Sequence, residues 1–150
     1  MRAVIQRVSQ ASVSIDEKKV ASINEGILVL LGIETQDTKE DSEWLSNKIS
    51  SLRIFSDKDG KMNKSVTEVN GEVIVVSQFT LHAKTKKGNR PSYIKSSRPE
   101  HAIPLYEQFK KDLSDVIGKE VQSGEFAADM KVSLTNDGPV TIIIDTKNKE

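Results

Sequence analysis

The sequence predicts one α/β domain spanning residues 1–150, mostly β-sheet with two helices. Three observations support this fold class. Short segments rich in β-branched residues alternate with turn residues along much of the chain. Two other segments repeat their apolar residues at helical spacing. The length suits a single domain, and we find neither an internal repeat nor a linker.

The expected strands have β-rich composition and are bounded by turns. In chain order they are residues 2–8, 12–15, 20–23, 27–33, 53–55, 72–80, 121–122, 130–135 and 140–146. The run 27–33 has no polar face, which is typical of a strand buried on both sides. Asn70-Gly71 predicts a hairpin before residues 72–80. Residues 147–150 are expected to fray.

Two helices are expected from apolar spacing. The first repeats Trp44, Leu45, Ile49 and Leu52, and Asp37 or Thr38 can cap its start. The apolar stripe of the second consists of Ala102, Leu105, Tyr106, Phe109, Leu113, Val116 and Ile117, and Gly118 ends it. Pro99 suits a first turn, whereas Pro104 predicts either a later start or a kink.

Charge is balanced overall but uneven along the chain. Twenty-two basic and 22 acidic residues give a net charge of zero, which argues against holding nucleic acid by bulk electrostatics. Residues 82–98 form a long polar loop, a feature that usually indicates function or disorder. Within it, residues 84–98 carry six basic residues and no acidic one. This segment is either a solvated loop or a local phosphate contact.

Several common kinds of site are not predicted. There is no cysteine, so thiol chemistry and zinc-thiolate sites are excluded. His82 and His101 lack ligand spacing, so we expect no metal and no cofactor, and His82 is expected at the surface. Ser77 and His82 lie outside any nucleophile-elbow motif. No segment reaches membrane-spanning length, so we expect a cytoplasmic protein without a membrane partner.

Two segments combine groups that could form a binding site. Ser-Gln-Phe-Thr-Leu at residues 77–81 ends an apolar strand and is either a hydrogen-bonding and stacking site or a plain strand end. Asn-Asp-Gly-Pro-Val-Thr at residues 136–141 is either an ordinary hairpin turn or a rigid loop whose carbonyls point away from the sheet. A Gly-Pro dipeptide does not by itself predict a cis bond.

Together these two segments resemble signatures of the D-aminoacyl-tRNA deacylase family, once called D-tyrosyl-tRNA deacylases. Residues 5–8, 52–55, 60–63, 87–92 and 126–130 are similar to the family in the same order. The resemblance implies a barrel-like antiparallel or mixed sheet and a homodimer. It also implies hydrolysis of the ester joining a D-amino acid, or mischarged glycine, to the terminal adenosine of tRNA. No DNA partner is expected.

The resemblance also assigns roles to residues. Ser77, Gln78, Phe79 and Thr80 would line the catalytic pocket for the ester and the terminal adenosine, with Met130 packed around the adenosine. Gly138-Pro139, beside Asn136, would be cis and would enter the partner's active site. There its carbonyl oxygens would hold the substrate amino group, and an L-side chain would collide with it. Arg7 would steady the partner's loop.

The chemistry can be assigned in two ways. Thr80 could act as a nucleophile, but its hydroxyl is weak without a base, and the sequence shows none. We therefore favour attack by water, with main-chain N–H groups near Phe79 and Thr80 stabilising the oxyanion and the substrate 2′-hydroxyl assisting. Two other classes remain open: a tRNA- or nucleotide-binding module without catalysis, and a hydrolase of small esters or D-amino-acid derivatives.

Overall fold

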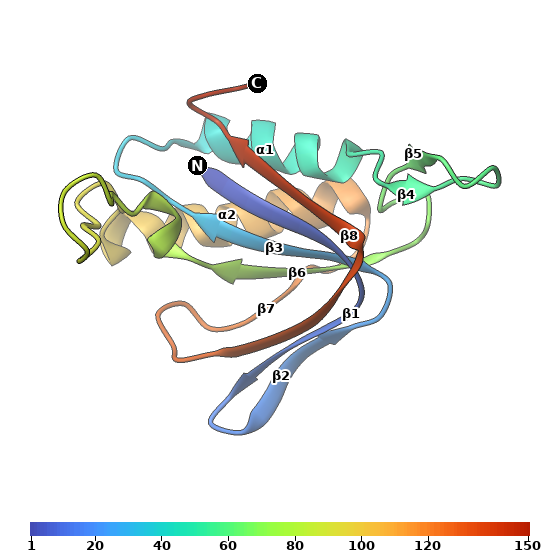
Figure 1. Ribbon diagram of the computed structural model, residues 1–150, viewed down its shortest axis with the longest axis horizontal. Coiled ribbons are helices and arrows are strands. Elements are labelled where there is room, and N and C mark those ends of the chain that lie inside the picture. Colours follow the sequence, from blue (N-terminus) through green and yellow to red (C-terminus); the bar gives the residue numbers. More distant parts are fainter.

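A computed structural model describes all residues from 1 to 150 (Figure 1). The strands are β1 Arg2–Ile15, β2 Lys18–Ile23, β3 Gly26–Gly32, β4 Phe55–Ser56, β5 Met62–Lys64, β6 Glu72–Ser77, β7 Gln122–Ser123 and β8 Lys131–Asp145. The helices are α1 Lys39–Ser51, the 3₁₀ turn η1 Phe79–His82 and α2 Pro99–Ile117. The predicted single α/β domain with two α-helices is confirmed.

The main sheet is built around the long strand β1. One edge of β1 pairs antiparallel with β3 and β2, and the other edge pairs antiparallel with β8. β6 joins β3 in parallel, and β7 joins β6 in parallel, so the six-stranded sheet is mixed. The Ser22 N–H donates to Gln122 Oε1 at 2.8 Å, which links β2 to β7. The sheet is therefore nearly closed, as the expected barrel-like fold requires.

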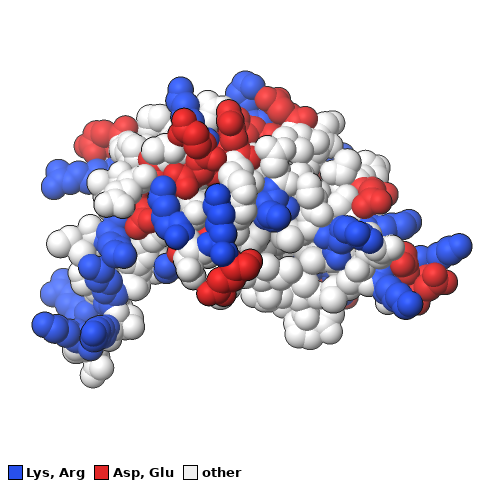
Figure 2. Space-filling view, turned by 90° about the horizontal axis from the view of Figure 1, so that it is seen from above, with Lys and Arg blue, Asp and Glu red and all other residues white.

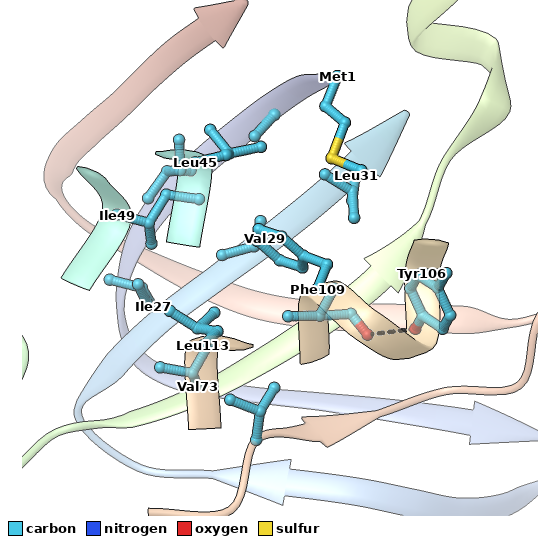
Figure 3. Packing of buried hydrophobic residues seen from close by; sticks show 14 of the residues in the cluster. Met1, Ile27, Val29, Leu31, Leu45, Ile49, Val73, Tyr106, Phe109 and Leu113 are labelled. Atoms are coloured by element: carbon cyan, nitrogen blue, oxygen red, sulfur yellow. Dashed lines mark hydrogen bonds between the residues drawn. The ribbon is translucent and has the colours of Figure 1, made fainter. Parts of the chain in front are cut away.

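Both helices cover one face of the sheet, and the main core lies beneath them (Figures 1 and 3). Leu45 and Ile49 of α1 and Phe109 and Leu113 of α2 are at most 1% exposed in this core. β3 contributes alternate residues to it, whereas Leu28 faces a second apolar cluster on the opposite side of the sheet. The prediction that this strand is buried on both faces is confirmed.

Several local predictions were wrong because pairing at long range determines the outcome. Residues 2–8 and 12–15 belong to one continuous strand, in which irregular register takes the place of a break. The strand expected over residues 72–80 ends at Ser77, where η1 follows. Asn70-Gly71 forms a turn without a hairpin, because β6 pairs in parallel with β3. α2 starts at Pro99 and includes Pro104, so the later start is also wrong.

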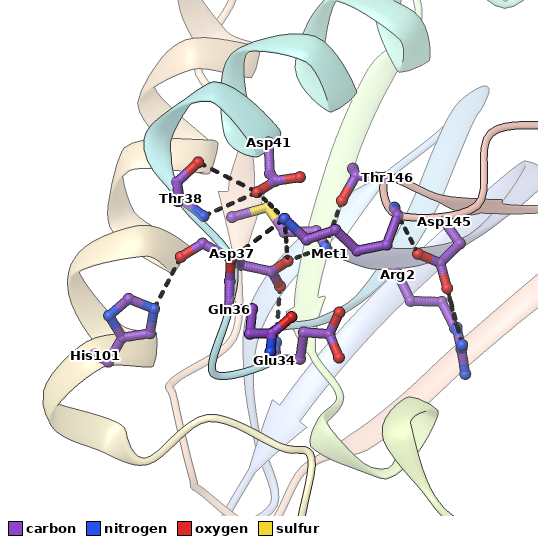
Figure 4. A network of polar contacts seen from close by, with 11 residues as sticks. Met1, Arg2, Glu34, Gln36, Asp37, Thr38, Asp41, His101, Asp145 and Thr146 are labelled. Carbon is purple, nitrogen blue, oxygen red and sulfur yellow. Dashed lines mark hydrogen bonds and ion pairs between the residues drawn. The ribbon is translucent and has the colours of Figure 1, made fainter.

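The C-terminal residues are held in place, contrary to the expected fraying (Figure 4). Lys147 Nζ lies 2.8 Å from Asp41 Oδ2, and the Met1 ammonium donates to Thr146 Oγ1 at 2.6 Å. The same ammonium contacts the buried Asp37 carboxylate. These polar contacts connect both ends of the chain to the start of α1. No helix is long and apolar enough to cross a membrane.

Stability should depend on pH through Asp41. Burial alone would raise its pKa, but hydrogen bonds from Lys147, Thr146 and the Thr38 backbone hold the pKa well below the ordinary value of 3.8. A pKa lowered by folding stabilises the protein above the unfolded value, and this stability is lost as the pH falls. We expect the free energy of unfolding in urea to fall below about pH 4, and to fall less steeply in Asp41→Asn.

Asp16→Asn is the matched control, because Asp16 lies in an exposed turn and forms no ion pair. It should keep the pH dependence of the wild type. Equal slopes in the wild type and Asp41→Asn would contradict the role given to Asp41.

Candidate functional site

A cavity of about 540 Å³ lies where β3 and β6 end beside η1 and the start of α2. Most of its 16 lining residues are hydrophobic, with hydroxyl and amide groups among them. The lining residues are Leu31, Ile33, Val76, Ser77, Gln78, Phe79, Ser96, Ser97, Pro99, Ala102, Phe126, Ala127, Ala128, Asp129, Met130 and Val132. An apolar hollow with a few polar groups is typical of a small-molecule or cofactor site.

Four of the predicted site residues meet in this pocket, and a fifth does not line it. Ser77, Gln78, Phe79 and Met130 are among the lining residues. Thr80 is not, and its hydroxyl accepts a hydrogen bond from Gln78 Nε2 at 2.5 Å. No histidine or carboxylate hydrogen-bonds to the Thr80 hydroxyl. The observed partner of the Thr80 hydroxyl is thus an amide, which is not a base.

The main chain at the end of β6 supplies hydrogen-bond donors. The Gln78 N–H still pairs with the Leu31 carbonyl at 2.8 Å, after which the chain turns into η1. Phe79 and Thr80 occupy the first two positions of this turn, and their N–H groups have no protein acceptor. Two unpaired donors at the edge of an apolar pocket can stabilise a developing negative charge.

Residues 136–141 form an excursion within β8, so the hairpin interpretation is wrong. β8 pairs with β1 on both sides of the segment, with Asn136 opposite Val8 and Thr141 opposite Gln6. Residues 137–140 have no partner on β1, and their carbonyls are free of this ladder. The Gly138-Pro139 peptide bond is cis, as the family resemblance implied.

Two side chains hold this excursion in place. Arg7 Nε donates to the Asp137 carbonyl at 3.1 Å, and Arg7 Nη1 donates to the Ile54 carbonyl at 2.6 Å. Asn136 Nδ2 donates to the carbonyls of Arg7 at 3.0 Å and Val140 at 2.9 Å. Arg7 thus steadies the loop of its own chain, and a contact with the partner's loop stays a prediction.

Position 138 has room only for glycine. Its φ is +123°, in a region that other residues rarely adopt. A Cβ there would lie 2.7 Å from Arg7 Nη2 and 2.9 Å from Val140 Cγ2. The loop conformation therefore depends on Gly138.

The pocket and the loop lie apart in one chain. None of residues 136–139 lines the pocket, and the loop lies near β4 while η1 lies at the opposite end of the molecule (Figure 1). Residues 131–136 of β8 separate Met130 from the loop, and an extended strand of that length spans roughly 20 Å. Within one chain, the loop therefore does not reach the pocket.

Sequence reasoning missed part of the pocket wall. Ser96 and Ser97 come from the polar loop, and their small side chains gave no signal, while Ala102 at the start of α2 was expected only in the apolar stripe of that helix. Ala127 also lines the pocket and has a φ of +65°. The family-like stretch 126–130 was the sequence feature that could have indicated this part of the wall. His82 is buried at 4% exposure, so the expected surface position is wrong. No group of three or more His, Cys, Asp or Glu side chains could hold a metal ion.

The fold and the site define a class of protein: a nearly closed barrel-like domain whose pocket offers main-chain donors. Comparison with known proteins gives the family. The sequence model described as D-Tyr-tRNA(Tyr) deacylase matches residues 4–145. The D-aminoacyl-tRNA deacylases of Flavobacterium psychrophilum and Bacteroides fragilis are 67% and 65% identical to this chain, with both chains covered completely. The chain belongs to the D-aminoacyl-tRNA deacylase family, a family of ester hydrolases.

Solved structures agree on the fold. A protein named c-Myc DNA Unwinding Element Binding Protein has a TM-score of 0.92 at 40% identity, over 97% of this chain and 98% of its own. A probable eukaryotic D-amino acid tRNA deacylase has a TM-score of 0.83 at 17% identity, over 95% and 97%. The second likeness concerns the fold alone.

Removing the Asn136 amide should loosen the loop without unfolding the domain. Asn136→Ala deletes three hydrogen bonds at the base of the excursion, two donated by Nδ2 and one accepted by Oδ1 from Thr141, which costs about 1–3 kcal/mol of unfolding free energy. Hydrogen exchange should quicken at the amides of residues 137, 138 and 140 while β3 stays protected. Gln10→Ala, which removes a 3.5 Å cross-strand contact outside the loop, is the control. Unchanged exchange in Asn136→Ala would contradict the bracing role.

Proposed function

We propose that this protein hydrolyses the ester between a D-amino acid and the terminal adenosine of tRNA, and that it also accepts tRNA charged with glycine. The observation that carries the proposal is the apolar pocket edged by two unpaired main-chain donors, Phe79 N–H and Thr80 N–H. The full-length similarity to deacylases supports the substrate class.

Catalysis proceeds through attack by water on the ester carbonyl carbon. The oxyanion then collapses with cleavage of the bond to the adenosine oxygen, which takes up the proton that the water loses. The ester carbonyl lies against the N–H groups of Phe79 and Thr80, and the oxyanion that forms on attack accepts hydrogen bonds from both. Removing one such donor typically costs about 10²–10³ in rate, so two fixed donors supply much of the acceleration. The substrate 2′-hydroxyl positions the water. The Thr80 hydroxyl, already bonded to Gln78, orders the turn that presents the donors.

The terminal adenosine is held by apolar surface. Phe79 is 54% exposed, and its ring meets Tyr93 edge to face at 5.0 Å between centroids, which fixes the orientation of the ring. Met130 lies in the same pocket. Stacking of a base on such a ring contributes about 1–3 kcal/mol of binding free energy, whichever amino acid is esterified to the adenosine.

Selection against L-amino acids comes from a second copy of the chain. The Gly138-Pro139 loop of one subunit enters the pocket of its partner, where its carbonyl oxygens bind the substrate α-amino group. An L-side chain then collides with the loop, while a D-side chain points away and glycine has none to collide. Two features support a homodimer: the free outer edge of β8, and Ile143, which is 69% exposed on that strand.

The activity can be tested with charged tRNA. Wild-type protein should release amino acid from D-tyrosyl-tRNA and glycyl-tRNA but not from L-tyrosyl-tRNA, measured as loss of labelled ester. Thr80→Ala should retain hydrolysis of D-tyrosyl-tRNA within about tenfold, because loss of a true nucleophile costs several more orders of magnitude.

Hydrolysis of both tyrosine enantiomers at one rate would contradict chiral selection. Binding without release would favour the non-catalytic binding module. A covalent acyl group trapped on Thr80 would overturn the water mechanism.

Assembly of the site across a dimer predicts complementation between two defective variants. Ala128→Trp blocks the pocket, and Gly138→Ala displaces the loop, so each alone should lose selective hydrolysis of D-tyrosyl-tRNA. A co-expressed mixture should recover up to about a quarter of wild-type activity, because half of random dimers contain one intact combined site.

A mixture of two pocket variants, Ala128→Trp and Ser77→Trp, is the control and should recover nothing. If isolated heterodimers of the first pair stayed inactive, the loop and the pocket would not come from different subunits.

A further inference from the structure

Residues 84–98, which we name the basic arm, concentrate unpaired positive charge at one end of the molecule. All six cationic side chains of the arm are exposed. None of them takes part in an ion pair or a side-chain hydrogen bond. They are Lys84, Lys86, Lys87, Arg90, Lys95 and Arg98. Figure 2 shows a dense group of basic side chains at the left end, where the arm lies in Figure 1.

Exposed lysines elsewhere do not form such a surface. Lys18 and Lys19 directly follow Asp16 and Glu17 in the β1–β2 turn, so their field is partly cancelled. The arm's own sequence contains no acidic residue, and the acidic residues that share a hollow with it, Glu34 and Asp145, lie with Lys84 and Lys95. In a chain of zero net charge, the arm is the longest basic stretch without a compensating acid. It is therefore the surface best suited to a polyanion.

The arm is fixed to the mouth of the pocket. Lys84 and Ser92 exchange backbone hydrogen bonds at 2.8 and 3.0 Å, which closes the arm on itself. Tyr93 contacts the Phe79 ring, and Ser96 Oγ donates to the Phe79 carbonyl at 2.9 Å. Ser96 also lines the pocket. A nucleotide chain whose last residue occupies the pocket would leave it beside these cations.

We propose that the basic arm binds the phosphates of the acceptor end of tRNA, next to the nucleotide held in the pocket. This inference rests on the proposed function and identifies the part of the substrate that is recognised outside the pocket. Because its own sequence carries six basic residues and no acidic one, the arm carries most of the electrostatic contact, and the protein binds tRNA at its end. Such contacts read phosphate positions rather than base sequence.

Charge reversal on the arm should lower kcat/KM for the aminoacyl-tRNA substrate but not for a substrate without the tRNA phosphates. Lys86→Glu/Lys87→Glu is compared with the control Lys18→Glu/Lys19→Glu on D-tyrosyl-tRNA and on D-tyrosyl-adenosine, which lacks the preceding phosphates. The arm variant should lose about tenfold or more in kcat/KM on tRNA and change little on the nucleoside ester. For the arm variant, the slope of log kcat/KM against log salt concentration should become shallower by about 1.5–2. The control should match the wild type on both substrates.

Binding of uncharged tRNA, followed by fluorescence anisotropy, separates this inference from the proposed function. Weaker binding by the arm variant supports phosphate binding by the basic arm, even if the wild-type protein hydrolyses no charged tRNA. Absence of hydrolysis would contradict only the proposed activity. Equal losses of kcat/KM on tRNA and on the nucleoside ester would contradict phosphate binding by the basic arm, since they would indicate damage to the pocket. Equal losses in the arm and control variants would overturn it as well, because they would indicate a diffuse charge effect.

Discussion

The antiparallel pairing of β1 with β8 is the interaction on which the rest of the molecule depends. It runs along one full edge of β1, while the other edge holds β3 and β2 and so the remainder of the sheet. One end of β8 adjoins the pocket at Met130 and Val132, and the middle carries the Gly138-Pro139 excursion. A single pairing thus positions both the pocket and the loop.

The proposed chemistry relies on main-chain atoms, which explains why side-chain motifs gave no candidate. The donors at Phe79 and Thr80 are created by the change from strand to 3₁₀ turn. The proposed selective element is a carbonyl-bearing loop held by Arg7 and Asn136. Groups of this kind leave no signature of histidines or paired carboxylates. They depend instead on backbone conformation, which glycine at position 138 makes possible.

Sequence patterns predicted the parts of the fold that local periodicity controls. The capping box at Thr38 and the apolar stripe of α2 gave two helices close to those observed. Residues 136–141 show where local rules fail: four turn-forming residues predicted a reversal, yet β1 pairs with β8 on both sides and carries the strand onward. The same holds for the C-terminal tail, whose contacts with α1 no local pattern could indicate. In the pocket, Ser77, Gln78 and Phe79 belong to a segment whose composition already indicated either a binding site or a strand end, and Met130 was found through family resemblance. Small residues such as Ser96 were missed because only tertiary packing brings them there.

The number of residues in β8 between Met130 and Asn136 also determines the distance from the pocket to the loop and the face of the sheet on which the loop emerges. Alternate residues of a strand face opposite sides, so losing one residue there would turn the following segment over as well as shorten it by about 3.3 Å. The loop would then emerge from the wrong face of the sheet. Side chains along this stretch can vary within the limits of packing, but their number is constrained. This stretch of β8 should therefore tolerate substitutions far better than insertions or deletions.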